Sequence, residues 1–507
     1  MYIHLLGLLL AGGLAFFYLL RALISPLRSV PGPLLARCTD SWYLWRITKG
    51  KFEFDNIELH RKHGPVIRYG PNRFSFDDPQ ASKIIYGHGT HLKKSAWYET
   101  WKFPKPTDQW NLFEERNQKR HALLRKPFSN TYSTTSLVSF EPYIDECTDL
   151  FVQRLRESAG KGVALDFGHW LQCYAFDVIG NITFARRFGF LDHGDDIGGV
   201  ISALETSASY SAKVGVYPQF HGFLFKLAGL LAGEDGSGFK FVNKFANDTI
   251  KEYRDSRKAA VDSSQSGGGN ESFLSMFYKK HEENPTQFTS YHVFAGCAQN
   301  VGAGSDTTAI SLSATFYHLL KNPQCFHKLR EEIDDGIKQG TVSQKPTFKE
   351  TQSMPYLQAV IKEALRLHPA TGFPLEREVP EGGATISGRF FPAGTIVGIN
   401  AWVEHRNKQV WGEDADQFRP ERWLIDDADK LSLMNRHWIP FGMGSRVCIG
   451  KNISLLEMQK LVPLIVREFD LDLAGGRAWT WTTINHWFVK PKGFKVLVNQ
   501  RNDKAEG

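Results

Sequence analysis

Residues 441–450 read FGMGSRVCIG, and this short stretch decides how the rest of the chain is interpreted. A single cysteine, Cys448, stands between Arg446 and Gly450 and follows two further glycines. A helical pattern begins directly afterwards, so the sulfur is expected near backbone N–H groups and near the N-terminus of a helix. Both features stabilise a thiolate, which acts as a nucleophile or as a metal ligand. The adjacent glycines and arginine make a purely structural, buried cysteine a poor explanation.

This decapeptide resembles the haem-binding signature of the cytochrome P450 monooxygenases, Phe-x-x-Gly-x-Arg-x-Cys-x-Gly. All the signature positions are filled, by Phe441, Gly444, Arg446, Cys448 and Gly450. The resemblance implies that the chain holds haem b and that the Cys448 thiolate is the axial ligand of the iron. It also implies that Arg446 pairs with a haem propionate, since a guanidinium fork suits a carboxylate.

A second family motif lies in a helical pattern, where residues 303–308 read AGSDTT. Gly304 would cost about 1 kcal/mol in an ordinary helix, which makes room for a diatomic ligand a plausible reason for it. The resemblance implies that Ala303 and Gly304 lie against the haem. It further implies that Asp306 and Thr307 deliver protons during O2 activation, which is general-acid catalysis. Taken alone, the same residues also fit a Thr-lined helix bend with a solvated Asp.

A third motif, KEALRLHP, places Glu363 and Arg366 three residues apart on one face of a helix predicted from Pro355 to Pro369. An isolated pair of this kind is most often a surface ion pair. The resemblance joins Arg422, in FRPERW, to these two residues. We interpret the three as a buried structural network that supports the haem loop, because two arginines around one carboxylate orient it and do not react.

The resemblance also assigns cations to the haem carboxylates. His121 and Arg125 lie four apart in HALLRK, where the wider family usually has Trp and Arg; both rings offer an N–H donor. Arg377, in PLEREVPEGG, is the third propionate residue. Substrate contacts are expected in two regions, the aromatic-rich residues 88–113 and residues 371–375, although ordinary loop packing explains those aromatics equally well.

The N-terminus predicts a membrane anchor. From Tyr2 to Leu20 there are 19 residues without a formal charge, and arginines follow. This length crosses a hydrocarbon core of about 30 Å, and a cleaved signal peptide would carry its charges on the other side. The positive-inside rule then places the body in the cytosol. We expect an anchor over residues 1–24, a Pro-rich hinge over 25–37 and one catalytic domain over 38–507, in a single-pass protein of the endoplasmic reticulum membrane.

Composition is that of a globular protein, with 42% hydrophobic and 23% charged residues. The net charge of +7 is too small for a dedicated nucleic-acid binder, and six cysteines without a regular spacing do not form a disulfide framework. The pattern predicts a hairpin over 65–77, a helical middle with helices from Thr289 to Leu320 and from Pro323 onward, and a mixed C-terminal third with a helix from Asn452 to Phe469. The fold class is therefore mainly α with small β-sheets, and the resemblance makes it the P450 fold.

The expected activity follows from the resemblance: a monooxygenase that inserts one oxygen atom of O2 into a lipophilic small molecule. No nucleotide-binding fingerprint or fused flavin domain is visible, so NADPH-derived electrons are expected from a separate protein, NADPH–cytochrome P450 reductase. Two stretches resemble fungal microsomal members near pisatin demethylase, which act on secondary metabolites. A reductase-independent isomerase or dehydratase and a non-catalytic haem sensor are the alternatives. The substrate, the oxidised position and the oligomeric state do not follow from the sequence.

Overall fold

The computed structural model of the chain describes residues 12–13, 20, 23–102, 111–231, 238–262 and 271–501. The predicted membrane anchor at residues 1–24 lies largely outside these ranges. Within them, no helix combines the length and the apolarity that crossing a membrane requires.

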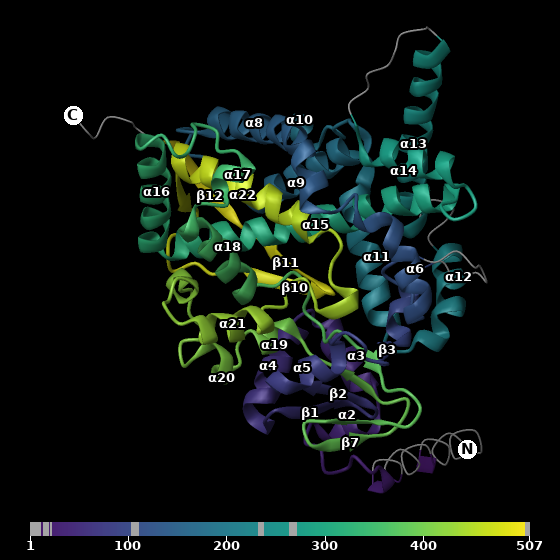
Figure 1. Cartoon of the computed structure of the whole chain (residues 1–507). Coiled ribbons are helices and arrows are strands. Elements are labelled where there is room, and N and C mark those ends of the chain that lie inside the picture. Colours follow the sequence, from purple (N-terminus) through teal and green to yellow (C-terminus); the bar gives the residue numbers. More distant parts are fainter. Residues whose placement is uncertain are drawn as a thin grey trace, which may run out of the picture.

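Helices make up the bulk of the body, and strands form small sheets beside them, which confirms the α+β class (Figure 1). The predicted helices after residue 289 are confirmed within one or two residues of every bound that the sequence predicted. They are α15 (Ser290–Lys321), α16 (Pro323–Lys338), α18 (Pro355–Leu367) and α22 (Lys451–Glu468). Prolines begin α16 and α18, because their fixed φ and missing N–H cost nothing at a first helical position.

The remaining helices follow the chain. They are α2 (Leu34–Cys38), α3 (Ser41–Thr48), α4 (Phe52–His63), α5 (Pro79–Tyr86), α6 (Gln118–Ser129), α7 (Thr134–Leu137), α8 (Glu141–Ser158), α9 (Phe167–Phe184), α10 (Phe190–His193), α11 (Val200–Val214), α12 (His221–Leu231), α13 (Gly238–Asp262), α14 (Phe273–Glu283), α17 (Phe348–Thr351), α19 (Ala401–Glu404), α20 (Lys408–Trp411) and α21 (Ala428–His437). Short 3-10 turns include η1 (Ala96–Trp101), η5 (Pro420–Trp423) and η6 (Gly444–Arg446).

Within the ranges given above, four small sheets accompany the helices. The largest has the strand order β1-β2-β8-β5-β3, and its β1–β2 pair is the hairpin predicted over 65–77. The others have the orders β4-β12-β9, β10-β11 and β6-β7. The strands are β1 (Val66–Gly70), β2 (Arg73–Phe76), β3 (Lys93–Lys94), β4 (Leu165–Asp166), β5 (Arg377–Glu378), β6 (Ala384–Ile386), β7 (Arg389–Phe391), β8 (Ile396–Gly398), β9 (Phe469–Leu473), β10 (Thr482–His486), β11 (Phe488–Lys492) and β12 (Lys495–Gln500).

The main core lies where α15 packs against α9, α18 and α22. Helix α9 is apolar on nearly all sides and is buried over most of its length, as expected for a helix inside a large body. Its buried Asp177 accepts backbone N–H groups from residues 188–191 at 2.8 to 3.2 Å. That carboxylate satisfies donors at the turn after the helix that would otherwise be buried without a partner.

The C-terminal hairpin β10–β11 lies against α11 and α15. Its strands pair antiparallel from Thr482↔Lys492 to His486↔Phe488, so a single residue, Trp487, forms the tip. Trp487 has a φ of +83°, which is rare for a residue with a side chain. Its backbone is held on both sides, by Asn485 Oδ1 and by the N–H of Gly372. The hairpin therefore reaches the interior in a fixed conformation.

Candidate active site around Cys448

The peptide that carries Cys448 forms a tight loop before α22. The turn η6 leads to Cys448, whose backbone N–H donates to the carbonyl of Phe441 at 2.8 Å. The backbone N–H groups of Gly450 and Lys451 donate to the sulfur. Burial raises the pKa of this thiol, and the two N–H groups act against the rise. The loop thus points two dipoles at the atom that must carry a negative charge as a ligand.

Cys448 also differs from the other five cysteines in accessibility. It is exposed, whereas Cys38 is half-buried and the remaining four are buried. Burial nevertheless raises the pKa of its thiol, because protein atoms surround the sulfur. At Gly450, a Cβ would meet no protein atom within 4 Å. An exposed cysteine whose sulfur accepts two backbone N–H groups suits the ligand of a haem iron.

Two glycines shape this loop by their backbone angles. Gly442 and Gly444 have φ values of +72° and +66°, in the region where side chains are rarely tolerated. At Gly444, a Cβ would stand 1.9 Å from the carbonyl oxygen of Tyr86, at the end of α5. Close approach of two backbones therefore requires glycine at position 444, independently of any bound group.

The arginines expected to face haem carboxylates gather around the same loop. Arg125 on α6 donates to the carbonyl of Val447 at 2.8 Å, which fixes it beside Cys448. Arg446 donates to the carbonyl of Glu115 at 2.6 Å, and Arg377 donates to the carbonyl of Glu376 at 3.0 Å. Each of these contacts uses one donor of a guanidinium that has five, so further donors remain for an acidic group.

Burial and neighbouring cations lower the pKa of Arg446 and of His121. Burial, followed by repulsion from Arg377, lowers the pKa of Arg446 to about 10. Burial, followed by Arg446, lowers the pKa of His121 to about 3. His121 is therefore neutral near pH 7 and offers an N–H donor, without a charge. A cluster of mutually repelling cations suits an acidic ligand, and the two propionates of haem b have this chemistry.

Sequence reasoning missed one member of this cluster, Lys94 on β3. Its side chain is buried, and Nζ donates to the carbonyl of Phe113 at 2.5 Å. Nζ also lies 4.2 Å from the ring centroid of Tyr98. Burial, with Arg377 and Arg446, lowers the pKa of Lys94 well below its ordinary value. The only signal in the sequence was a lysine pair in an aromatic-rich region, which is more typical of a solvated loop.

On α15, the residues of the predicted motif differ in their exposure and in their contacts. Ala303 is exposed and Thr307 is partly exposed, one helical turn apart, and the Thr307 hydroxyl donates to the Ala303 carbonyl at 2.7 Å. Helix packing is a sufficient reason for glycine at position 304. A Cβ there would stand 2.9 Å from Ile179 on α9, so the glycine is required for helix packing. The space that it leaves is already filled by protein.

Asp306 is 2% exposed, and its carboxylate has no hydrogen bond to Thr307 among the described residues. Its carboxylate accepts from Gln172 Nε2 at 2.5 Å and lies 2.9 Å from Lys490 Nζ. A solvated Asp on a helix bend, the alternative interpretation of this motif, is therefore wrong. The acid and the alcohol are neighbours in sequence but have separate partners.

Glu363, Arg366 and Arg422 form one buried network, with side chains that are 0 to 1% exposed. The carboxylate of Glu363 accepts from Arg366 and Arg422 at 2.8 Å and from the indole of Trp423 at 3.0 Å. Burial alone would raise the pKa of Glu363, but the two arginines lower it below its ordinary value. Arg366 also donates to the carbonyls of His405 and Ala415, each at 2.6 Å. Every charge is therefore paired, which a buried network requires.

The aromatic residues of the predicted substrate regions form one cluster with the hairpin tip. The ring of Trp487 lies 4.7 Å from that of Trp97 and about 6.1 Å from those of Tyr98 and Phe373. Trp97, Tyr98 and Phe373 are buried among these neighbours. Residues 103–110 of the same predicted region lie outside the described residues.

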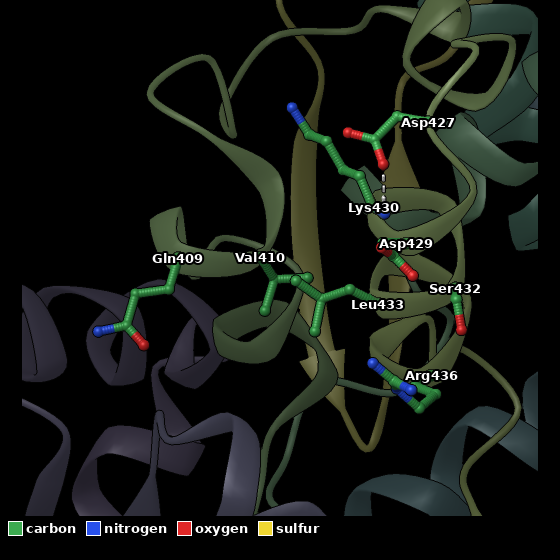
Figure 2. Close-up of a pocket in the computed structure, with 8 residues that line it drawn as sticks. All are labelled: Gln409, Val410, Asp427, Asp429, Lys430, Ser432, Leu433 and Arg436. Carbon is green, nitrogen blue, oxygen red and sulfur yellow. Dashed lines mark hydrogen bonds between the residues drawn. The ribbon is translucent and has the colours of Figure 1, made fainter.

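A surface hollow of about 520 Å³ lies elsewhere, between α20 and the segment around α21. Figure 2 shows Gln409 and Val410 on one side and Asp427, Lys430 and Arg436 on the other. None of the residues considered above lines it. Its mixture of surface charges gives no arrangement suited to catalysis.

Comparison with known proteins adds an independent finding. The family model described as cytochrome P450 matches residues 41–498. The chain is 39% identical over 485 residues to a pisatin demethylase of Fusarium vanettenii, covering 96% of this chain and 91% of that protein. It is 38% identical to cytochrome P450 monooxygenases of Aspergillus terreus, over 90% of this chain and 93% of that protein, and of Emericella nidulans, over 96% of both.

Proposed function

The chain belongs to the cytochrome P450 family, and we propose that this haem-dependent monooxygenase uses Cys448 as its axial ligand and oxidises a lipophilic small molecule of fungal secondary metabolism. The observation that carries the ligand assignment is the geometry of the loop. The cysteine is exposed, and two backbone N–H groups donate to its sulfur. No other cysteine of the chain combines these features.

The cation cluster supports the way in which haem b is held. Arg125, Arg377 and Arg446 provide guanidinium donors, and His121 provides a neutral N–H donor for the propionates. Lys94 joins them, because a carboxylate nearby would favour its charged form. The haem supplies the one-electron steps and the O2 activation for which side chains have no equivalent. The protein's own contribution is to fix the thiolate, neutralise the carboxylates and move protons.

Each turnover consumes a C–H bond, one O2, two electrons and two protons, and gives a hydroxylated product and one water. The electrons derive from NADPH and arrive from a separate redox partner. The protons must reach the site through this chain. Thr307 presents its hydroxyl on the accessible face of α15, and Asp306 lies directly beside it in the sequence. These two residues are proposed as the final donors.

We assign the redox partner as NADPH–cytochrome P450 reductase, docking near α6 and the start of α22. Lys119, Lys126 and Lys451 are exposed there, close to the loop of Cys448. Leu123, on the same helix α6, is 74% exposed. A basic surface with an apolar residue suits an acidic protein partner.

Membrane association is part of the proposal. Residues 1–24 would anchor a single catalytic domain, 38–507, through the hinge 25–37, with the domain on the cytosolic side of the endoplasmic reticulum. Large apolar side chains are exposed on α2 and around α12, and these surfaces suit contact with lipid. They include Leu34, Leu35, Phe220, Phe223 and Leu230, which are 52 to 82% exposed.

The substrate class rests on the relatives and on the aromatic cluster. One relative is named for the demethylation of pisatin, and O-demethylation begins with hydroxylation of the methyl carbon, so the same reaction type is open to this chain. The apolar rings of Trp97, Phe373 and Trp487 at the hairpin tip suit a flat, lipophilic molecule.

The test is the reduced carbon monoxide spectrum of the full chain. Cys448→Ser is expected to abolish the red-shifted band of a thiolate-ligated haem, while Cys38→Ser, at a half-buried cysteine, keeps it. A wild-type band in Cys448→Ser would overturn the ligand assignment. With isotopically labelled O2, a reductase and candidate metabolites, the product must carry one labelled oxygen. Unlabelled product formed without reductase would identify a rearrangement enzyme instead.

A further inference from the structure

The proposed proton donor Asp306 is joined to the C-terminal hairpin by an ion pair. Lys490 on β11 places Nζ 2.9 Å from Asp306 Oδ2, and both side chains are largely shielded from water. On the other side of the carboxylate, Gln172 on α9 donates to Oδ1 at 2.5 Å. Three separate elements therefore hold one carboxylate in a single position.

Lys490 makes a second ion pair, with a carboxylate that is in contact with solvent. Its Nζ also lies 3.2 Å from Oε1 of Glu205 on α11, a carboxylate that is 40% exposed. Burial alone would lower the pKa of Lys490, but the carboxylates of Asp306 and Glu205 raise it above its ordinary value. The ammonium thus bridges a buried acid and an acid in contact with solvent.

A small hollow of about 90 Å³ opens at this bridge. Alternate residues of β10 and β11 share its lining with α11, because side chains two apart on a strand lie on the same face. The lining residues are Glu205, Ala208, Ile484, His486, Phe488, Lys490 and Lys492. Its size admits a few water molecules and excludes a substrate of the expected kind.

We propose that Lys490 is a positioning residue that holds the Asp306 carboxylate and connects it through Glu205 to this hollow, so that protons enter the site between α11 and the β10–β11 hairpin. The proposal rests on the proposed role of Asp306. A proton passes from water to Glu205, the Lys490 ammonium gives one proton to Asp306 and takes one from Glu205, and water carries the proton on from Asp306 to Thr307, with each donor restored from the solvent side. No atom other than hydrogen changes its bonds along this path.

The other charged and titratable groups near the hollow do not replace Lys490 as the partner of Asp306. Lys492, on the same strand, lies 3.4 Å from Glu205 and has no ion pair with Asp306 among the described residues. His486 on β10 has a pKa below its ordinary value because of burial, followed by repulsion from Lys213 on α11. It is neutral near pH 7 and does not compete with Lys490 for Asp306. Lys492 therefore contacts the solvent side of the path, and Lys490 is the lysine that contacts Asp306.

The test uses the full-length, haem-loaded enzyme with reductase, NADPH and O2 as the only substrates, so that no organic substrate is needed. Electrons then leave as hydrogen peroxide, using two protons per O2, or as two waters, using four. Lys490→Met is expected to slow NADPH consumption about tenfold and to increase the solvent isotope effect, because proton delivery becomes limiting. Lys490→Arg should restore most of the rate, and Lys495→Met, at an exposed lysine on β12 outside the lining of the hollow, should stay close to wild type.

A second measurement reads the ion pair without turnover. Lys490→Met should lower the thermal midpoint followed by tryptophan fluorescence, since it leaves a buried carboxylate unpaired. Asp306→Asn in the same background should recover part of that loss, as expected for directly interacting groups.

The outcomes separate the two proposals. A wild-type rate and isotope effect in Lys490→Met, with a lowered midpoint, would show that the pair is only structural and would overturn this inference. If Asp306→Asn slows turnover while Lys490→Met does not, the role of Asp306 stands and that of Lys490 falls. If Asp306→Asn itself leaves turnover unchanged, the assignment of Asp306 fails, and this inference fails with it.

Discussion

The buried imidazole of His405 accepts a 2.9 Å hydrogen bond from the backbone N–H of Ile439. Its other nitrogen donates to the carbonyl of Arg366, also at 2.9 Å. Ile439 in turn accepts from the N–H of Gly442, inside the cysteine loop, at 3.0 Å. The charge network around Glu363 is therefore connected to the haem loop through one ring. Only a neutral imidazole has one donor and one acceptor to make both bonds.

This connection predicts a pH dependence of stability. Burial, followed by Arg366, lowers the pKa of His405 well below 6.5. Below about pH 6.5 the unfolded chain binds a proton at this histidine and the native chain does not, so stability is lost as pH falls, by about 1.4 kcal/mol per pH unit. His405→Gln should be less stable at pH 7 and lose less stability between about pH 7 and pH 5. Urea unfolding measures both, and His88→Gln, at an exposed histidine, is the control. An unchanged slope in His405→Gln would contradict the neutral ring.

Glu363→Gln is expected to destabilise the native state by about 3–5 kcal/mol, because it leaves two buried guanidinium groups without a counter-charge. Glu421→Gln provides the comparison. That carboxylate pairs with Lys328 at 2.6 Å, but both side chains are 39 to 52% exposed, so the loss should be at most about 1 kcal/mol. Denaturant unfolding of both variants checks the difference. Equal losses would mean that burial does not set the strength of the network.

Gly444→Ala should prevent recovery of the haem-loaded protein. The new Cβ would collide with the carbonyl of Tyr86, a backbone atom that has no freedom to rotate away. Gly442→Ala also forces a side chain into a positive φ, but its nearest neighbour, Leu375, would be 3.6 Å away. It should therefore cost only the conformational strain, about 1–3 kcal/mol. The haem-to-protein absorbance ratio of the purified variants distinguishes the two. Similar ratios in the two variants would show that the close contact between Gly444 and α5 is not needed for haem binding.

Thr307→Ala is expected to shift electrons from NADPH toward hydrogen peroxide, several-fold relative to wild type, because the accessible hydroxyl on α15 is lost. Thr315→Ala is the matched control. Its hydroxyl makes the same kind of bond to a carbonyl four residues earlier, at 2.9 Å, but it is fully buried. Peroxide and NADPH are measured together, with O2 as the only other substrate. An unchanged ratio in Thr307→Ala would place proton delivery elsewhere.

Much of the fold was predictable from local patterns. The four helices after residue 289 begin and end close to the prolines and polar residues that marked them, and the β1–β2 hairpin follows its alternating pattern. The strand order of the small sheets was not predictable. Strands of two or three residues, such as β3 and β5, carry no periodicity of their own and exist because other elements bring them together.

The site was predictable only where a motif is local. The loop of Cys448 and the spacing of Glu363 and Arg366 could be read directly from the sequence. Lys94 and Lys490 could not, since each looks like a solvated lysine until the fold buries it beside other charges. The close approach of Ile179 to Gly304 could not be predicted either, because it depends on how α9 packs against α15.

The register of the β10–β11 hairpin has a consequence for how this protein can change. Trp487 at its tip joins the aromatic cluster, while Lys490, three residues later, reaches Asp306. Deleting or inserting one residue in β11 would turn Lys490 to the face that Val489 now occupies, which is fully buried. The tip can therefore change by substitution, whereas a change in the length of the hairpin would disturb the Lys490–Asp306 pair. Variant libraries built to alter substrate choice should keep residues 482–492 at constant length.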